Sequence, residues 1–218
     1  MRLISKSSLC ITLLAGFGAG LPACWAQKWE LGVLGGVGFY SNGTVTTPAG
    51  TGDVGFKSGA ALGAYLGNNM YRKFGGELRY EYRPGDLKVS SGGADATFKG
   101  EAHLIHYDFL FHFAGKDSSV RPFVAAGGGV KVYRGTGAAT ATQPLSGLAL
   151  LTDTHETSGL ASVGAGVKIH ATRRLGLRLE VHDFITPFPK QVIAPGPGGK
   201  ITGALHDIAV MGGIALYF

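Results

Sequence analysis

Cysteine is almost absent from this sequence. The two that occur, Cys10 and Cys24, both lie in the first 26 residues, so the chain from Gln27 onward has no thiol. Such a chain cannot form mispaired disulfides while it crosses an oxidising compartment unfolded. After residue 26 there is also no apolar run long enough for a membrane-spanning helix, which needs about 20 residues.

Charge is scarce as well, and neither sign dominates. Asp, Glu, Lys and Arg make up 16% of the residues and the net charge is +6; removing the two basic residues of the first 26 leaves +4. This weak and scattered excess does not predict a nucleic-acid partner. The 37 glycines exclude a coiled coil and argue against a helical bundle.

The first 26 residues have the pattern of a cleavable signal peptide. Two basic residues precede an apolar run over residues 9–21, which is too short to span a bilayer, and small residues lead up to a predicted cleavage site after Ala26. In the alternative interpretation the chain is a lipoprotein with an acylated Cys24, although a proline before the small residue that precedes this cysteine is unusual for such a site. We expect a leader at 1–26 and a single domain at 27–218.

Eight segments of the remaining chain alternate apolar residues with polar or small ones, which is the period of a β-strand with one apolar face. In 175–182, for example, three leucines and a valine alternate with Arg178, Glu180 and His182. The predicted strands are 28–40, 57–67, 74–83, 99–113, 122–134, 160–171, 175–182 and 206–218.

Short and long connections alternate between these segments. The short ones are 68–73, 115–121 and 172–174, and the long ones, rich in Gly, Thr, Ala and Pro, are 42–55, 84–98, 135–159 and 184–205. Aromatic residues collect at the short-turn ends, at Trp29, Phe74, Phe113 and Phe218. This layout predicts an all-β, eight-stranded antiparallel up-and-down transmembrane β-barrel.

A water-soluble eight-stranded barrel is the alternative fold. In such a barrel the charged face of the strands would point outward, and the apolar face with Phe109 and Phe111 would fill the core. Parity alone does not distinguish the two arrangements. The leader, the aromatic last residue and the unequal connections favour the membrane barrel.

Three segments carry a family resemblance. The last strand alternates apolar with small or polar residues and ends on Phe218, segment 74–83 reads FGGELRYEYR, and segment 121–130 reads RPFVAAGGGV. Together they resemble the small outer-membrane β-barrel superfamily of OmpA-like, OmpX-like and OmpW-like proteins. The resemblance implies a place in the outer membrane of a Gram-negative cell envelope, in contact with lipid and lipopolysaccharide. It also implies that Phe218 belongs to the signal that the β-barrel assembly machinery recognises.

Charged and histidine side chains of both signs fall on one parity of the predicted strands, the face that would line the lumen. An eight-stranded barrel is just wide enough for side chains to fill it, and buried charges are tolerated when they are paired. We expect a structural network that fills the lumen. The alternative is a narrow channel for small solutes; this lining disfavours small hydrophobic molecules. The predicted members are Glu30, Lys57, Glu77, Arg79, Glu81, Arg83, His106, Asp108, His112, Lys131, Lys168, His170, Arg178, Glu180, His182 and Asp207.

Catalytic and metal sites have little support. His106, Asp108 and His112 share the inner face, but strand residues two apart lie roughly 7 Å from each other, so neither a metal nor another cofactor is expected. A relationship to the barrels that hydrolyse lipid A would require a serine two positions after a histidine. No histidine has one, and no serine lies close to His182 in the sequence. We therefore expect that the chain is not an enzyme, and a lipid A-modifying hydrolase stays as an alternative.

The four long connections are the predicted contact points for an extracellular partner. Connection 135–159 contains four leucines and could fold over the barrel mouth. The sequence does not reveal a ligand. The expected function is therefore a structural or surface-interaction role in the outer membrane.

Overall fold

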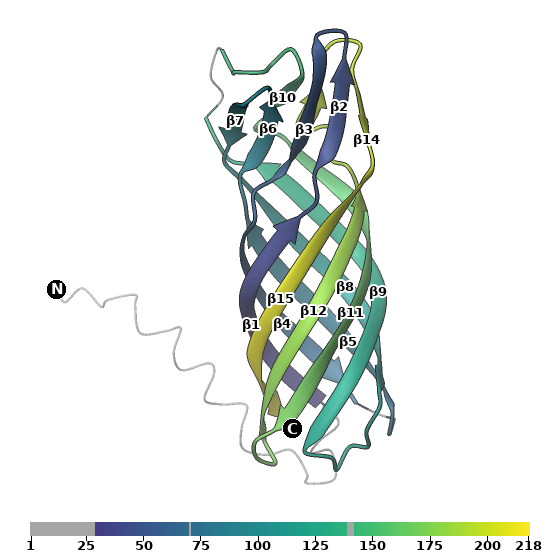
Figure 1. Cartoon of the computed structure of the whole chain (residues 1–218). Coiled ribbons are helices and arrows are strands. Elements are labelled where there is room, and N and C mark those ends of the chain that lie inside the picture. Colours follow the sequence, from purple (N-terminus) through teal and green to yellow (C-terminus); the bar gives the residue numbers. More distant parts are fainter. Residues whose placement is uncertain (1–28, 70, 139–141) are drawn as a thin grey trace, which may run out of the picture.

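The computed structural model describes residues 29–69, 71–138 and 142–218, and the predicted leader at 1–26 with its cleavage site lies outside them. The described residues form strands, turns and loops, as Figure 1 shows. None of them belongs to a helix long and apolar enough to cross a membrane.

Eight strands close into one antiparallel barrel. In chain order they are β1 (Trp29–Tyr40), β4 (Gly59–Asn68), β5 (Phe74–Pro84), β8 (Gly100–His112), β9 (Val120–Gly135), β11 (His155–His170), β12 (Leu175–Pro187) and β15 (Ala204–Tyr217). Each pairs with its neighbour in the chain, and β1 closes the barrel by pairing with β15. The predicted closed eight-stranded antiparallel barrel is confirmed.

The last strand joins the first at both of its ends. Val33 is opposite Ile214 in the middle of the pair, and the backbone amides of Trp29 and Phe218 donate hydrogen bonds to each other's carbonyl oxygens. Phe218 itself is exposed, one residue beyond the end of β15. The seam is therefore a complete ladder, and the barrel has no open edge between β1 and β15.

The apolar parity of the strands faces outward, and the charged parity faces inward. On β12 Leu175, Leu177, Leu179 and Val181 are exposed, while the charged residues that alternate with them are buried. The soluble-barrel alternative is therefore wrong for this chain, because it needs the opposite arrangement. We call the outward-facing side chains the apolar belt; they include Leu31, Val33, Val37, Phe39, Leu62, Leu66, Leu78, Ile105, Phe109, Val124, Val130, Val163, Leu177, Leu179, Val181, Ile208, Val210, Ile214 and Leu216.

The long connections contain strands, which the sequence did not predict. They form a five-stranded sheet in the order β14-β2-β3-β6-β7 and a separate pair, β10 with β13. We call these seven strands the cap: β2 (Gly43–Thr47), β3 (Gly50–Phe56), β6 (Leu87–Ser91), β7 (Ala94–Phe98), β10 (Ala149–Leu151), β13 (Ile193–Pro195) and β14 (Lys200–Thr202). The barrel strands also run further than expected, since β11 begins at His155 and β12 ends at Pro187.

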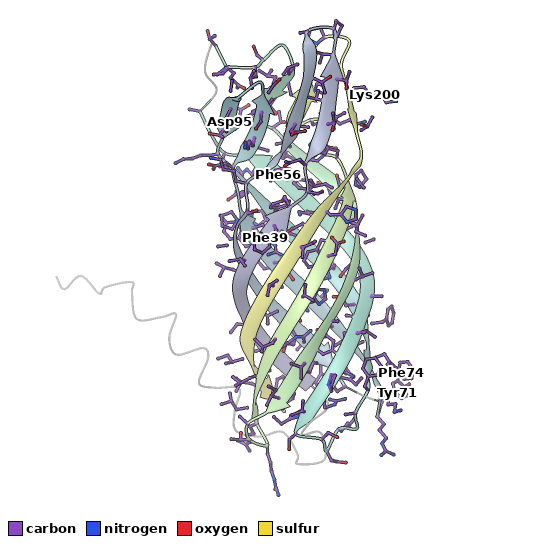
Figure 2. The ribbon with its side chains drawn as sticks, in the orientation of Figure 1. Phe39, Phe56, Tyr71, Phe74, Asp95 and Lys200 are labelled. Atoms are coloured by element: carbon purple, nitrogen blue, oxygen red, sulfur yellow. The ribbon has the colours of Figure 1, made fainter. Side chains whose placement is uncertain are left out.

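The cap lies at one end of the barrel, and the short turns and the C-terminus lie at the other (Figure 1). Figure 2 shows Lys200 and Asp95 on the cap, and Tyr71 and Phe74 near the short turns. The cap has its own apolar core, in which Val45, Val54, Leu87, Val89, Leu148, Leu151, Ile193 and Ile201 are buried. This core continues into the barrel through Phe56, whose ring stacks on Tyr133 of β9 at 5.1 Å.

Candidate functional site: a charged lumen

Most of the predicted lumen residues point into the barrel. Fourteen of the sixteen are buried, namely Glu30, Glu77, Arg79, Glu81, Arg83, His106, Asp108, His112, Lys131, Lys168, Arg178, Glu180, His182 and Asp207. His170 has the same parity but lies at the short-turn end of β11, where it is half-buried.

Lys57 was placed in the lumen incorrectly. It lies in the connection between β3 and β4, its side chain is 47% exposed, and its amine pairs with Asp86 at 3.6 Å. The predicted strand began at residue 57, whereas β4 begins at Gly59. The alternation of inward-facing and outward-facing residues holds only within a strand. Because the predicted strand began two residues too early, the alternation assigned this lysine to the lumen.

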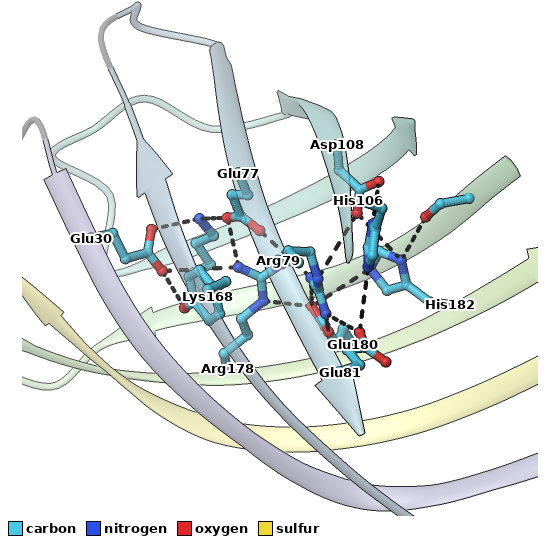
Figure 3. Close-up of polar contacts among 12 residues, drawn as sticks. Glu30, Glu77, Arg79, Glu81, His106, Asp108, Lys168, Arg178, Glu180 and His182 are labelled. Atoms are coloured by element: carbon cyan, nitrogen blue, oxygen red, sulfur yellow. Dashed lines mark hydrogen bonds and ion pairs between the residues drawn. The ribbon is translucent and has the colours of Figure 1, made fainter. Parts of the chain in front are cut away.

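The first cluster of charges lies nearest the short turns. The amine of Lys168 on β11 donates hydrogen bonds to Oε2 of Glu30 at 2.6 Å and to Oε1 of Glu77 at 2.8 Å. Arg178 on β12 donates to the same Glu77 oxygen at 2.7 Å (Figure 3). Tyr65 on β4 adds a hydrogen bond from its hydroxyl to Glu30 at 2.5 Å. Strands β1, β4, β5, β11 and β12 are thereby tied together through the interior.

Arg79 links this cluster to the next one. Its guanidinium lies 3.6 Å from Glu77, donates to Oε1 of Glu81 at 3.0 Å, and makes a two-pronged contact with Glu180. Arg178 approaches the same Glu180 carboxylate from its own strand at 2.6 Å. Figure 3 shows the two guanidinium groups side by side among these carboxylates. A two-pronged contact between an arginine and a carboxylate fixes the relative orientation of the two groups and also pairs their charges. Arg79 therefore links β5 to β12 across the lumen.

Histidines occupy the level of Asp108. Nδ1 of His106 is hydrogen-bonded to Asp108 at 3.1 Å, so side chains two apart on β8 do reach each other. Nδ1 of His182 lies 3.8 Å from the other oxygen of Asp108. Within residues 29–69, 71–138 and 142–218, no set of three or more His, Cys, Asp and Glu side chains is arranged to hold a metal ion.

A serine does lie near His182, although none is near it in the sequence. Ser162 on β11 places its hydroxyl 3.5 Å from Nδ1 of His182, and Glu180 lies 3.6 Å from Nε2. The register brings them together, because Gly164 is opposite His182. Gly164 is needed there, since a Cβ at that position would lie 2.6 Å from the imidazole ring.

A third group of charges lies nearest the cap. Arg83 donates to Glu81 at 2.9 Å and lies 3.5 Å from Asp207. Lys131 donates to the same Asp207 oxygen at 2.7 Å, with its amine 4.7 Å from the centre of the Tyr40 ring. Lys131 is also 4.9 Å from the Tyr133 ring, which stacks on the cap residue Phe56. The charged lumen therefore ends against an aromatic layer.

The buried charges of the lumen balance. Among the described residues, six buried carboxylates (Glu30, Glu77, Glu81, Asp108, Glu180 and Asp207) equal in number six buried basic groups (Arg79, Arg83, Arg121, Lys131, Lys168 and Arg178). All of these basic groups except Arg121 lie within 4.0 Å of a carboxylate oxygen. Arg121 was not predicted to lie in the lumen, because it precedes the predicted strand by one residue, although it shares the parity of the inward-facing Phe123. Paired charges cost far less to bury than an unpaired one.

Comparison with known proteins identifies the fold. No family model and no curated protein sequence matches the chain. Among solved structures, Neisserial surface protein A matches with a TM-score of 0.52 and 12% identity, over 88% of this chain and 99% of that one. The outer membrane protein OprG from Pseudomonas aeruginosa matches with a TM-score of 0.55 and 13% identity, over 88% and 97%. The chain has the fold of the small eight-stranded outer-membrane β-barrels.

Proposed function

We propose that this chain is an integral outer-membrane protein that anchors the cap at the cell surface and keeps its lumen closed. The observation that carries the proposal is the apolar belt, which surrounds a charged interior. In water, exposure of so large an apolar surface would be unfavourable, whereas in a bilayer the same surface contacts the lipid acyl chains at little cost. Lipid and the acyl chains of lipopolysaccharide are the partners that such a belt fits.

The two ends of the barrel support one orientation. Small outer-membrane barrels place short turns in the periplasm and long loops outside. The cap corresponds to the long loops, so we assign it to the outside, where it offers a folded surface to an extracellular partner. The predicted leader at 1–26 would direct export, and the exposed Phe218 would be available to the assembly machinery.

The lumen supports an anchoring role over transport. Direct contacts run from Glu30 near the short turns through Arg79 to Asp207 beneath the cap. A permeating solute would have to separate these pairs, which leaves buried charges without their partners at a large cost in free energy.

A narrow polar conduit is the second candidate. Several buried polar atoms, including Oδ2 of Asp108 and Nη1 of Arg83, have no hydrogen-bond partner among the described residues. Such atoms are places where water would bind, and a chain of waters would make a path. Ion pairs along the lumen from Glu30 to Asp207 interrupt this path at each level of the network.

A hydrolase is less well supported than either role. The Ser162–His182–Glu180 contacts have the order of a nucleophile, base and acid. Ser162 is only 1% exposed, however, and faces the filled interior rather than the lipid. A substrate carbonyl could reach its hydroxyl only if the surrounding ion pairs opened first.

Single-cysteine labelling tests the proposed orientation. Because no cysteine occurs after residue 26, one introduced thiol is the only site for a maleimide in the processed chain. On intact cells, a membrane-impermeant maleimide is expected to label Lys200→Cys, on the exposed cap strand β14. Arg174→Cys, at the exposed turn before β12, should be labelled only after the outer membrane is permeabilised.

The two variants control for each other, since both positions are exposed in the isolated protein. Equal labelling of both on intact cells, or labelling of Arg174→Cys alone, would refute the assigned orientation.

A further inference from the structure

A cavity of about 360 Å³ lies at the short-turn end of the barrel, outside the paired network. Its wall is formed by Asn69 after β4, the connection between β8 and β9 with the start of β9, the end of β11 with the turn that follows, and the end of β15. The charged side chains in this wall are Lys116, Arg121, Arg173 and Asp117. Three basic groups against one carboxylate give the cavity a positive balance.

Arg121 distinguishes this cavity from an ordinary surface hollow. The residue is only 2% exposed, yet its Nε and Nη2 atoms have no hydrogen-bond partner among the described residues. The other five buried basic groups of the lumen each lie within 4.0 Å of a carboxylate oxygen, and Arg121 forms no such pair in the described chain. A buried guanidinium without an anion is unfavourable, and its planar fork of donors fits an oxyanion.

Two aromatic residues complete the wall. The Tyr217 hydroxyl is buried without a hydrogen-bond partner in the part of the chain that the structure describes. The His170 ring packs on the Tyr217 ring at 4.8 Å, and its Nδ1 lies 3.0 Å from the carbonyl oxygen of Ser118. Nδ1–H therefore donates to that carbonyl, which fixes the ring beside Tyr217. Tyr217 and Arg121 both line the cavity, and each carries a buried polar group that no described residue satisfies.

We propose that this cavity binds an oxyanion, the phosphate or carboxylate group of a small polar solute. Arg121 supplies the two-pronged contact, Tyr217 donates a further hydrogen bond, and Arg173 adds charge at the wall. The site is separate from transport, since the Lys168 cluster lies directly behind it: Lys168 is opposite Arg121 in the β11–β9 ladder. With the cap outside the cell, the cavity takes its ligand from the periplasm.

Calorimetric titration of the full protein in detergent tests the site, with inorganic phosphate and acetate as separate probes in a buffer free of both. Saturable binding of at least one anion to the wild type is expected. Arg121→Gln, which keeps similar size but removes the charge, is expected to weaken binding about tenfold or more, because a charged hydrogen-bonding partner is lost. Tyr217→Phe should weaken binding by a smaller factor, since it removes one neutral donor.

The turn between β11 and β12 supplies a matched control. Arg173 lines the cavity and its neighbour Arg174 does not, so Arg173→Gln should weaken binding while Arg174→Gln should leave it unchanged. If Arg121→Gln does not fold, as judged by the loss of heat-modifiable migration on a gel, Arg173→Gln and Tyr217→Phe carry the test.

Preference for phosphate would assign the site to phosphorylated solutes, and preference for acetate to carboxylates; either supports the proposal. Failure of both anions to saturate the wild type, or equal binding by Arg174→Gln and the cavity variants, would overturn it. Anion binding in detergent does not depend on whether the cap faces outward. A negative result in the calorimetric titration therefore leaves the proposed orientation standing, and a negative result in the labelling experiment leaves the anion site standing.

Discussion

Replacing Arg79 with alanine is expected to lower the free energy of unfolding in detergent by about 3–5 kcal/mol. The guanidinium holds Glu81 and Glu180 and lies 3.6 Å from Glu77. Its loss leaves carboxylates in a confined interior with fewer counter-charges, and water that enters the space left behind would reduce the penalty. The difference in the free energy of unfolding is measured by thermal or denaturant unfolding, with the loss of heat-modifiable migration on a gel as the readout.

Arg134→Ala is the matched control for this prediction. Arg134 is also an arginine in a barrel strand, but its side chain is 61% exposed and its ion pair with Glu101 is 3.8 Å long. Exposed pairs of this kind contribute at most about 1 kcal/mol. An Arg79→Ala effect no larger than that of Arg134→Ala would mean that the interior network does not stabilise the barrel.

Leu179→Arg is expected to destabilise the barrel in a phospholipid bilayer by about 2–4 kcal/mol, the penalty for arginine at the midplane. Leu179 is 57% exposed in the middle of the outward-facing run of β12, which extends from Leu175 to Val181. A charge there must stay in hydrocarbon or distort the bilayer around it. Reversible folding into phospholipid vesicles measures the difference.

Val120→Arg provides the depth control. Val120 is exposed at the first residue of β9, at the short-turn end of the barrel. Arginine near the membrane interface costs only about 0–1 kcal/mol. Similar penalties at both positions, or no penalty at Leu179, would argue against a bilayer around the belt.

Much of the barrel could be predicted from the sequence because its strands are long and alternate without interruption. The segment 175–182 reads as one apolar and one charged face, and both faces are found where parity places them. The cap could not be predicted in the same way. Its strands have three to seven residues, too few to show a period, and β14 pairs with β2 across more than 150 residues of chain.

The sequence predicts which residues line the interior, but it does not predict which of them contact each other. Parity identifies which side chains face inward, and it failed at Lys57 only because the strand boundary was wrong. The pairing of Arg79 with Glu180, or of Ser162 with His182, depends on strand register and barrel closure. Neither is encoded in the spacing of residues along one strand.

Paired charges are proposed to close the lumen, and the ion current through single protein molecules in planar bilayers measures whether they do. The protein inserted into planar bilayers is expected to show no steady ion conductance, because the contacts from Glu30 to Asp207 leave no level of the lumen without an ion pair. Steady open channels in the wild type, with a conductance that Arg79→Ala changes while its stability is unaffected, would contradict the claim and establish the conduit instead.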